Sequence, residues 1–189
     1  MRALLAAAVT AAALVTTPAV AQAQTSAMAC NPSLIPEPNS LIRRFWESKG
    51  GEDSAYGCPT SKEYGYPDKR GSWQVFEYGK VVWSPNFGEK AVIRLYRQDW
   101  GITFAWQGAS RDWQRYNVMW KTSGGAWQQK SDIPRRYMRI NKGYFQSDGD
   151  DNQSTRVHFK VQGCNSVGVF SGSECGVWSY PIAIDFPRS

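Results

Sequence analysis

The sequence predicts a mainly β protein in which a small α+β unit is followed by an antiparallel β-sandwich. Aromatic residues, which favour strands, are abundant, with 9 Trp, 9 Tyr and 8 Phe. The 17 glycines and 10 prolines supply the turns that many short strands need. In the second half of the chain, apolar and polar residues alternate as they do in half-buried strands. With 189 residues, 42% of them hydrophobic, the chain suits one ordinary domain or two small ones, and wholesale disorder is excluded.

The N-terminal segment has the pattern of a secretory signal peptide. Met1 and Arg2 precede a run of Ala, Leu, Val and Thr that ends in small residues near Ala23. This run is shorter than the roughly 20 apolar residues of a membrane-spanning helix. We therefore expect a signal peptide over residues 1–23, an extracellular or cell-wall-associated protein, and no membrane anchor after cleavage.

The first unit, residues 41–93, follows an extended lead-in over residues 24–40 that contains three prolines. A short helix is predicted to begin after Ser40, a candidate N-cap, because apolar pairs follow it at spacing i, i+4. Gly50 and Gly51 supply its C-terminal stop. The helix is too short to be stable without tertiary packing.

A β-hairpin is predicted next, with strands over residues 73–78 and 81–84. Glycine at the first position of a two-residue connection fits a type II′ turn. We therefore expect the turn at Gly79 and Lys80.

The β-sandwich is predicted over residues 94–189. Its strands have apolar residues at every second position, separated by loops rich in Gly, Ser, Asp and Asn. This alternation assigns five aromatic side chains to the core, namely Phe104, Trp106, Tyr116, Trp120 and Phe159.

Four cysteines, Cys30, Cys58, Cys164 and Cys175, allow three disulfide pairings. Proximity in the chain favours Cys30 with Cys58 and Cys164 with Cys175. In an oxidising compartment, each bridge contributes about 2–4 kcal/mol to stability. A zinc site is disfavoured, because the chain has no CxxC pair and a single histidine.

Three pieces of the first unit resemble the LGFP repeat, a unit of secreted, wall-associated actinobacterial proteins. They are IRRFW at residues 42–46, YGCPTS at residues 56–61 and WQVFEYGKVVWSP at residues 73–85. The resemblance runs from residue 41 to about residue 93 and implies attachment to a cell-wall polymer. The chain departs from the family in having one such unit and a cysteine, Cys58, inside the name-giving tetrapeptide.

The second half resembles a fibronectin type III-like sandwich, less specifically. The similarity rests on four segments, residues 102–106, 116–120, 157–165 and 175–181. It implies a scaffold, since this fold serves many functions.

Catalytic signals are weak. His158 is the one imidazole in the chain, its strand position is opposite the apolar face, and no G-x-S-x-G turn is present. Asp148, Asp150 and Asp151 form the acidic cluster, which is typical of a solvated loop. A calcium-loop pattern begins there but fails at Gln153, where glycine is required. We expect no enzymatic activity, no metal and no cofactor.

A basic group interleaved with aromatic residues superficially suits nucleic acid. Its members are Arg135, Arg136, Tyr137, Arg139, Lys142 and Tyr144. Export makes nucleic acid an improbable partner, so we interpret the group as a solvated sheet edge, with attraction to phosphate-bearing or uronate wall polymers as the alternative.

Aromatic residues of the first unit are the candidate glycan ligands, because flat rings with a polar edge stack on sugars. The candidates are Trp73, Phe76, Tyr78, Trp83 and Phe87. We therefore expect a secreted, non-catalytic protein that binds cell-wall polysaccharide or peptidoglycan through the first unit, with the sandwich as a spacer or second binding surface.

Two other functions stay open. In the first, the protein recognises another secreted protein through the loop over residues 165–174, which a bridge from Cys164 to Cys175 would pre-organise. In the second, which ranks last, it is a small wall hydrolase that depends on Asp150.

Overall fold

The computed structural model describes residues 29–68, 70–144, 155–167 and 172–186. The expected signal peptide and the acidic cluster at Asp148, Asp150 and Asp151 lie outside the described residues. Within them, no helix is long and apolar enough to cross a membrane.

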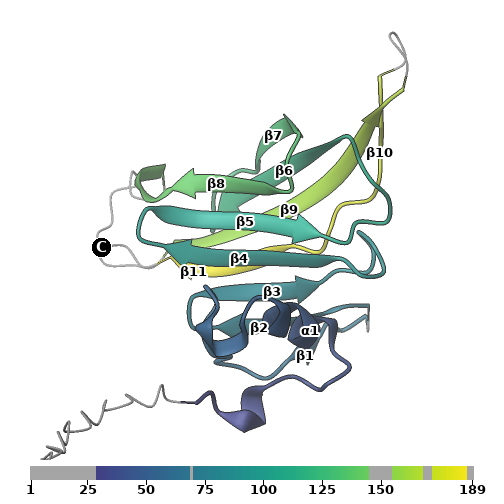
Figure 1. Cartoon of the computed structure of the whole chain (residues 1–189). Helices are drawn as coiled ribbons and strands as arrows, with labels where there is room; N and C mark the ends of the chain where they lie inside the picture. The colour runs from purple at the N-terminus through teal and green to yellow at the C-terminus, as the bar shows by residue number, and fades with distance from the viewer. Residues whose placement is uncertain (1–28, 69, 145–154, 168–171, 187–189) are drawn as a thin grey trace, which may run out of the picture.

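Two antiparallel sheets pack face to face, as the mainly β prediction requires (Figure 1). Sheet A has the strand order β1-β2-β3-β4-β5-β8. Its strands are β1 (Tyr64–Gly65), β2 (Ser72–Phe76), β3 (Gly79–Trp83), β4 (Val92–Gln98), β5 (Gly101–Gln107) and β8 (Tyr137–Asn141).

Sheet B has the order β10-β9-β6-β7, and β11 pairs with β9 beside β10. Its strands are β6 (Arg115–Thr122), β7 (Gln128–Ile133), β9 (Thr155–Ser166), β10 (Ser173–Cys175) and β11 (Ile182–Phe186). The helical elements are α1 (Leu41–Ser48) and the 3₁₀ turns η1 (Pro32–Leu34), η2 (Gly51–Asp53) and η3 (Lys142–Tyr144).

The larger core lies between the sheets. Phe104 stacks on Phe159 with ring centroids 5.1 Å apart, and Trp106 meets Tyr116 edge-on at 5.2 Å. All four rings are buried, so the period-2 assignment of these residues to the core is confirmed. Trp120, the fifth residue of that prediction, is half-buried and packs at the margin of this core.

A second core lies on the opposite face of sheet A, under α1. The Ser40 hydroxyl accepts hydrogen bonds from the backbone N–H groups of Ile42 and Arg43, which confirms the predicted N-cap. Ile42, Phe45 and Trp46 are buried against the sheet. The Trp46 indole N–H also donates to the Gly57 carbonyl at 3.0 Å, which holds the helix against the following loop.

Both predicted disulfides are present, Cys30–Cys58 and Cys164–Cys175. The first ties the lead-in to the loop that follows α1. The second joins β9 to β10, whose Cys164 and Cys175 face each other in the ladder. The lead-in has a further anchor, because the buried Gln74 amide donates to the carbonyls of Leu34 and Ser61.

The predicted boundary between residues 93 and 94 falls inside a strand. β4 crosses it and pairs with β3 on one side and β5 on the other. Val82 and Phe87, from the predicted first unit, also lie in the core between the sheets. The two units therefore share sheet A, since a ladder of backbone hydrogen bonds runs through the predicted boundary.

The turn of the first hairpin was wrongly predicted. Phe76 pairs with Gly79, so Glu77 and Tyr78 form the two-residue connection. Gly79 instead begins β3, where a Cβ atom would lie 2.4 Å from the Leu95 carbonyl oxygen of β4. Glycine is present because two strands approach closely there.

We predict that Gly79→Ala destabilises the fold by about 2 kcal/mol, because the added methyl group must push β3 away from β4. Thermal or urea unfolding measures this loss. Gly143→Ala is the matched control, since a Cβ there meets a single atom at 3.6 Å, an ordinary contact. Equal stability of the two variants would contradict the close approach at Gly79.

Candidate functional site

Two of the five predicted glycan ligands are buried, which corrects that prediction. Phe76 and Phe87 are each 2% exposed. Phe76 points toward α1 and packs against Trp46 and Tyr56. Phe87, in the loop after β3, belongs to the core between the sheets. Neither ring can reach a polymer.

The other three predicted ligands do not form one patch. Trp83 packs on the α1 side of sheet A, and its indole N–H donates to the Glu89 carbonyl at 2.9 Å. Tyr78 lies in the hairpin turn and is 54% exposed. Trp73 faces the opposite side of the sheet and packs at the margin of the core between the sheets.

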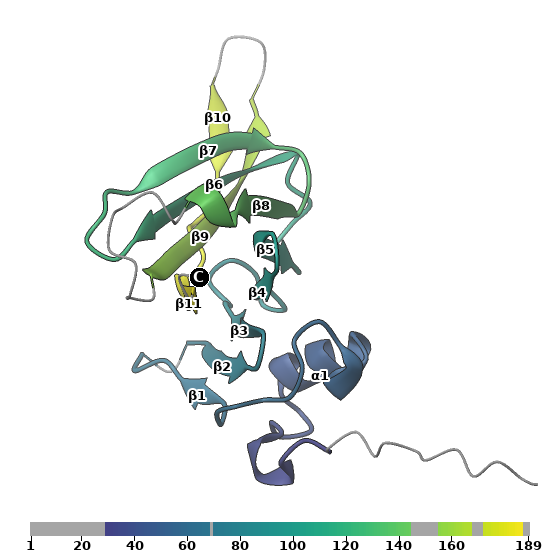
Figure 2. The same cartoon turned by 90° about the vertical axis from the view of Figure 1, so that its left-hand side faces the viewer.

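The side of sheet A that carries Trp73 is only partly covered by sheet B. In Figure 2, α1 lies on one side of sheet A and sheet B on the other, and the β1 end of sheet A extends beyond β11. β11 packs against β3 and β4. The face of β1 and β2 that continues from the core is therefore left open.

Aromatic side chains line this open face. Tyr64 pairs with Trp73 across β1 and β2, and their ring centroids are 4.9 Å apart. Tyr66 stacks on Tyr180 at 4.7 Å. Tyr64 is 48% exposed and the other three rings are half-buried. We call these four residues, together with Lys80, the aromatic strip.

Polar contacts hold the Tyr66–Tyr180 pair in place. The Tyr180 hydroxyl donates to the Asp68 carboxylate at 2.6 Å, and the Tyr66 hydroxyl donates to the Pro181 carbonyl at 3.3 Å. The hydrogen bond from Tyr180 lowers the pKa of Asp68, and burial raises the pKa of Tyr66 to about 12. At neutral pH Tyr66 is therefore neutral, and Asp68 beside it is ionised.

Lys80 supplies the positive charge of the strip. Its ammonium group lies 4.1 Å from the centroid of the Trp73 ring, a cation–π contact. Burial, assisted by the nearby Arg156, lowers the pKa of Lys80 to about 8. Lys80 is therefore still mainly protonated at pH 7, although the fold disfavours its charge.

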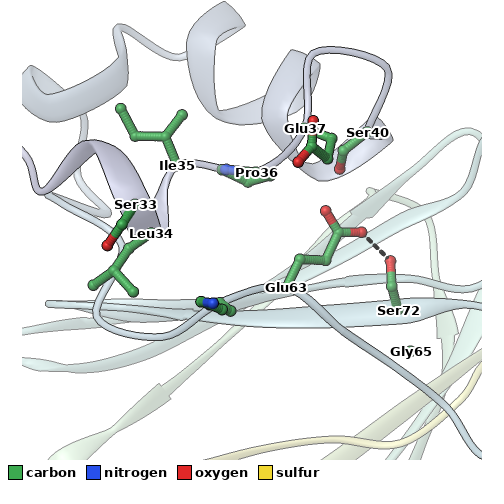
Figure 3. Close-up of a pocket in the computed structure, with 10 residues that line it drawn as sticks. Ser33, Leu34, Ile35, Pro36, Glu37, Ser40, Glu63, Gly65 and Ser72 are labelled. Carbon is green, nitrogen blue, oxygen red and sulfur yellow. Dashed lines mark hydrogen bonds between the residues drawn. The ribbon is translucent and has the colours of Figure 1, made fainter.

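A cleft of about 470 Å³, lined by both polar and aliphatic residues, lies on the α1 side of β1, between the lead-in and the sheet (Figure 3). Glu63 points into it toward Glu37 and Ser40, and its carboxylate accepts a hydrogen bond from the Ser72 hydroxyl. None of the residues that line this cleft is aromatic. The cleft offers hydrogen bonds without a flat ring on which a sugar could stack.

The basic group lies on and beside β8, at the opposite edge of sheet A from β1 and the strip. Within the basic group, Arg135 and Arg139 lie over the Tyr137 ring, and Arg136 pairs with Asp112. The three guanidinium groups thus already have partners within the fold.

His158 lies on the outer side of β9. Burial, with the nearby charges of Arg156 and Lys121, lowers the pKa of His158. Among the described residues, one group could in principle hold a metal, Cys30 with Glu52 and Cys58, but both sulfurs are committed to the disulfide. A disulfide sulfur is not the thiolate that binds a metal.

Comparison with known protein families gives one match, which covers the first five strands of sheet A in chain order. Residues 57–108 match the LGFP repeat family. The matched segment contains β1 to β5, and therefore every residue of the strip except Tyr180. No curated protein and no solved structure matches the chain. The resemblance to fibronectin type III thus stays a prediction.

Sequence reasoning found Trp73 but missed Tyr64, Tyr66, Lys80 and Tyr180. Tyr64 and Tyr66 alternate around Gly65, a period-2 signal that was available in the chain. Tyr180 carried no such signal, because its place beside Tyr66 depends on the packing of the two sheets.

We predict that Lys80→Met changes the pH dependence of stability. The folded-state pKa of Lys80 is about 8, below its usual 10.5, so the unfolded chain binds more protons between these values. The free energy of unfolding of the wild type therefore increases relative to that of the variant as pH rises from 7 to 10. The measurement is the difference in urea midpoint between the two proteins at each pH. A difference that stays constant, or moves in the variant's favour, would contradict the depressed pKa.

Proposed function

We propose that this is a secreted, non-catalytic protein that binds cell-wall glycan through the aromatic strip of its LGFP repeat. The observation that carries the proposal is the open face of β1 and β2, where Tyr64 and Trp73 lie side by side inside the matched segment. An LGFP repeat indicates a cell-surface-associated or binding module.

The strip has the chemistry that sugar recognition needs. Pyranose rings carry C–H groups on their faces and hydroxyls at their rims, so they stack on aromatic rings while polar groups bind the rims. Tyr64 and Trp73 supply rings, and Asp68 and Lys80 supply an acceptor and a donor at opposite sides of the strip. The hydrogen bond from Tyr180 to Asp68 keeps that carboxylate in place before a ligand arrives.

Other properties agree with an extracellular location. The two disulfides are suited to an oxidising environment. Without Arg2 of the expected signal peptide, the net charge falls from +6 to +5, and this positive charge favours encounters with anionic wall polymers at low salt.

We predict that Tyr64→Ala weakens binding to purified cell walls about fivefold, the loss of about 1 kcal/mol of stacking. Co-sedimentation at low salt measures the bound fraction. Tyr78→Ala is the matched control, because Tyr78 is similarly exposed in the same unit but lies in the hairpin turn. This variant should bind like the wild type.

Two results would reject the proposal. One is a folded wild-type protein that stays in the supernatant at low salt. The other is equal binding by Tyr64→Ala and the wild type. Retention of a stoichiometric protein partner after glycan digestion would instead favour the protein-interaction alternative, and release of reducing ends from peptidoglycan would favour the hydrolase.

A further inference from the structure

The outer face of sheet B, which points away from sheet A, differs from the strip in its chemistry. Residues that alternate with the buried ones project from it on β6 and β9. Met119 pairs with Lys160, and Lys121 pairs with His158. All four side chains are half-buried, whereas the inward-facing Val118 and Phe159 are fully buried.

Two indole rings converge on one ammonium group at the centre of this face. The Lys160 Nζ atom lies 4.8 Å from the ring centroids of both Trp127 and Trp178. The Lys121 ammonium group lies 5.2 Å from the Trp127 ring. Trp127 immediately precedes the edge strand β7, and Trp178 lies beyond β9 at the other side of the sheet. Segments from two different sides of the sheet thus bring their rings to the same ammonium group.

Trp178 is held in this position by the backbone around it. The Gln162 amide donates to the Gly176 carbonyl at 2.7 Å, and the Ser179 N–H donates to the Val161 carbonyl at 2.8 Å. The Cys164–Cys175 bridge anchors the start of the same segment. The ring is therefore fixed beside Lys160 before any ligand arrives, which lowers the entropic cost of binding.

The charge of this face is positive. Lys121 and Lys160 lie at its centre, and Arg156 lies further along β9. Two acids of the described strands β6, β7, β9 and β11 lie at the margins of this face, and each is paired with an arginine, Asp185 with Arg156 at 3.4 Å and Asp132 with Arg115 at 3.0 Å. The two central lysines have aromatic rings as their described neighbours, and a ring does not neutralise an ammonium group.

We propose that the outer face of sheet B is a second polysaccharide-binding surface, specific for a linear anionic polymer. Sugar rings stack on Trp127 and Trp178, and acid groups of the polymer pair with Lys121 and Lys160. This surface is separate from the aromatic strip. Its ligand carries carboxylates or phosphodiesters, either of which pairs with an ammonium group.

The test measures binding of the whole chain, with both disulfides formed, to three soluble polymers at low salt. Polygalacturonate supplies carboxylates, phosphomannan supplies phosphodiesters between sugar rings, and dextran is neutral. We expect at least one anionic polymer to bind about tenfold more tightly than dextran. The double variant Lys121→Gln/Lys160→Gln should lose most of this preference.

Matched variants separate the site from general charge. Lys49→Gln/Lys90→Gln removes the same charge from two exposed positions outside sheet B and should keep affinity within about twofold. Trp127→Ala should weaken binding about fivefold, and Trp127→Phe, which keeps a ring, should restore most of it. Thermal unfolding checks that each variant is folded.

Three outcomes would overturn the proposal: no preference for either anionic polymer over dextran, equal losses in the two lysine double variants, or unchanged binding by Trp127→Ala. Tyr64→Ala separates this surface from the strip, because it should leave binding to the anionic polymer unchanged. Loss of wall binding by Tyr64→Ala, without loss here, would confirm two independent surfaces.

Discussion

The structure depends on how the two faces of sheet A are covered, because one face is covered less completely than the other. This six-stranded sheet has two apolar faces, and each must be shielded from water by a different part of the chain. α1 and the disulfide-linked lead-in cover one face, and sheet B covers the other. Sheet B reaches only to β3, so one face of β1 and β2 stays open. That open face is the place where aromatic rings are both ordered and accessible.

Order on the open face comes from groups that are distant in the chain. Tyr180 reaches Tyr66 because Ser84 accepts a hydrogen bond from the Tyr180 N–H at 2.9 Å, which ties the segment before β11 to the end of β3. Asn86 strengthens this junction by donating to the Trp178 carbonyl at 2.7 Å. The same short segment therefore positions Tyr180 for the strip and Trp178 for the outer face of sheet B.

The two proposed surfaces meet near β11. Lys80 of the strip lies within electrostatic range of Arg156 on β9 and Asp185 on β11. The charges of Arg156, Asp185 and Lys80 also act on His158.

Local patterns in the chain were enough to predict the helix with its Ser40 cap, both disulfides, and the alternating core of the sandwich. Capping, the closing of short loops and side-chain alternation involve residues that are close in sequence. The shared sheet could not be predicted that way, because β4 has a strand partner on each side and its residues do not show which partners it takes.

The exposure of the aromatic residues was decided by tertiary structure. Alternation separates Trp73 from Phe76 but does not show which face is covered, and here α1 buries Phe76 whereas sheet B leaves the edge of the other face open. Gly79 was predicted as a turn residue from its neighbours in the chain, and only the approach of the Leu95 carbonyl from β4 shows that it is a site of close contact. Whether a side chain is buried depends on which distant segment of the chain packs over it, and the local sequence pattern does not specify that segment.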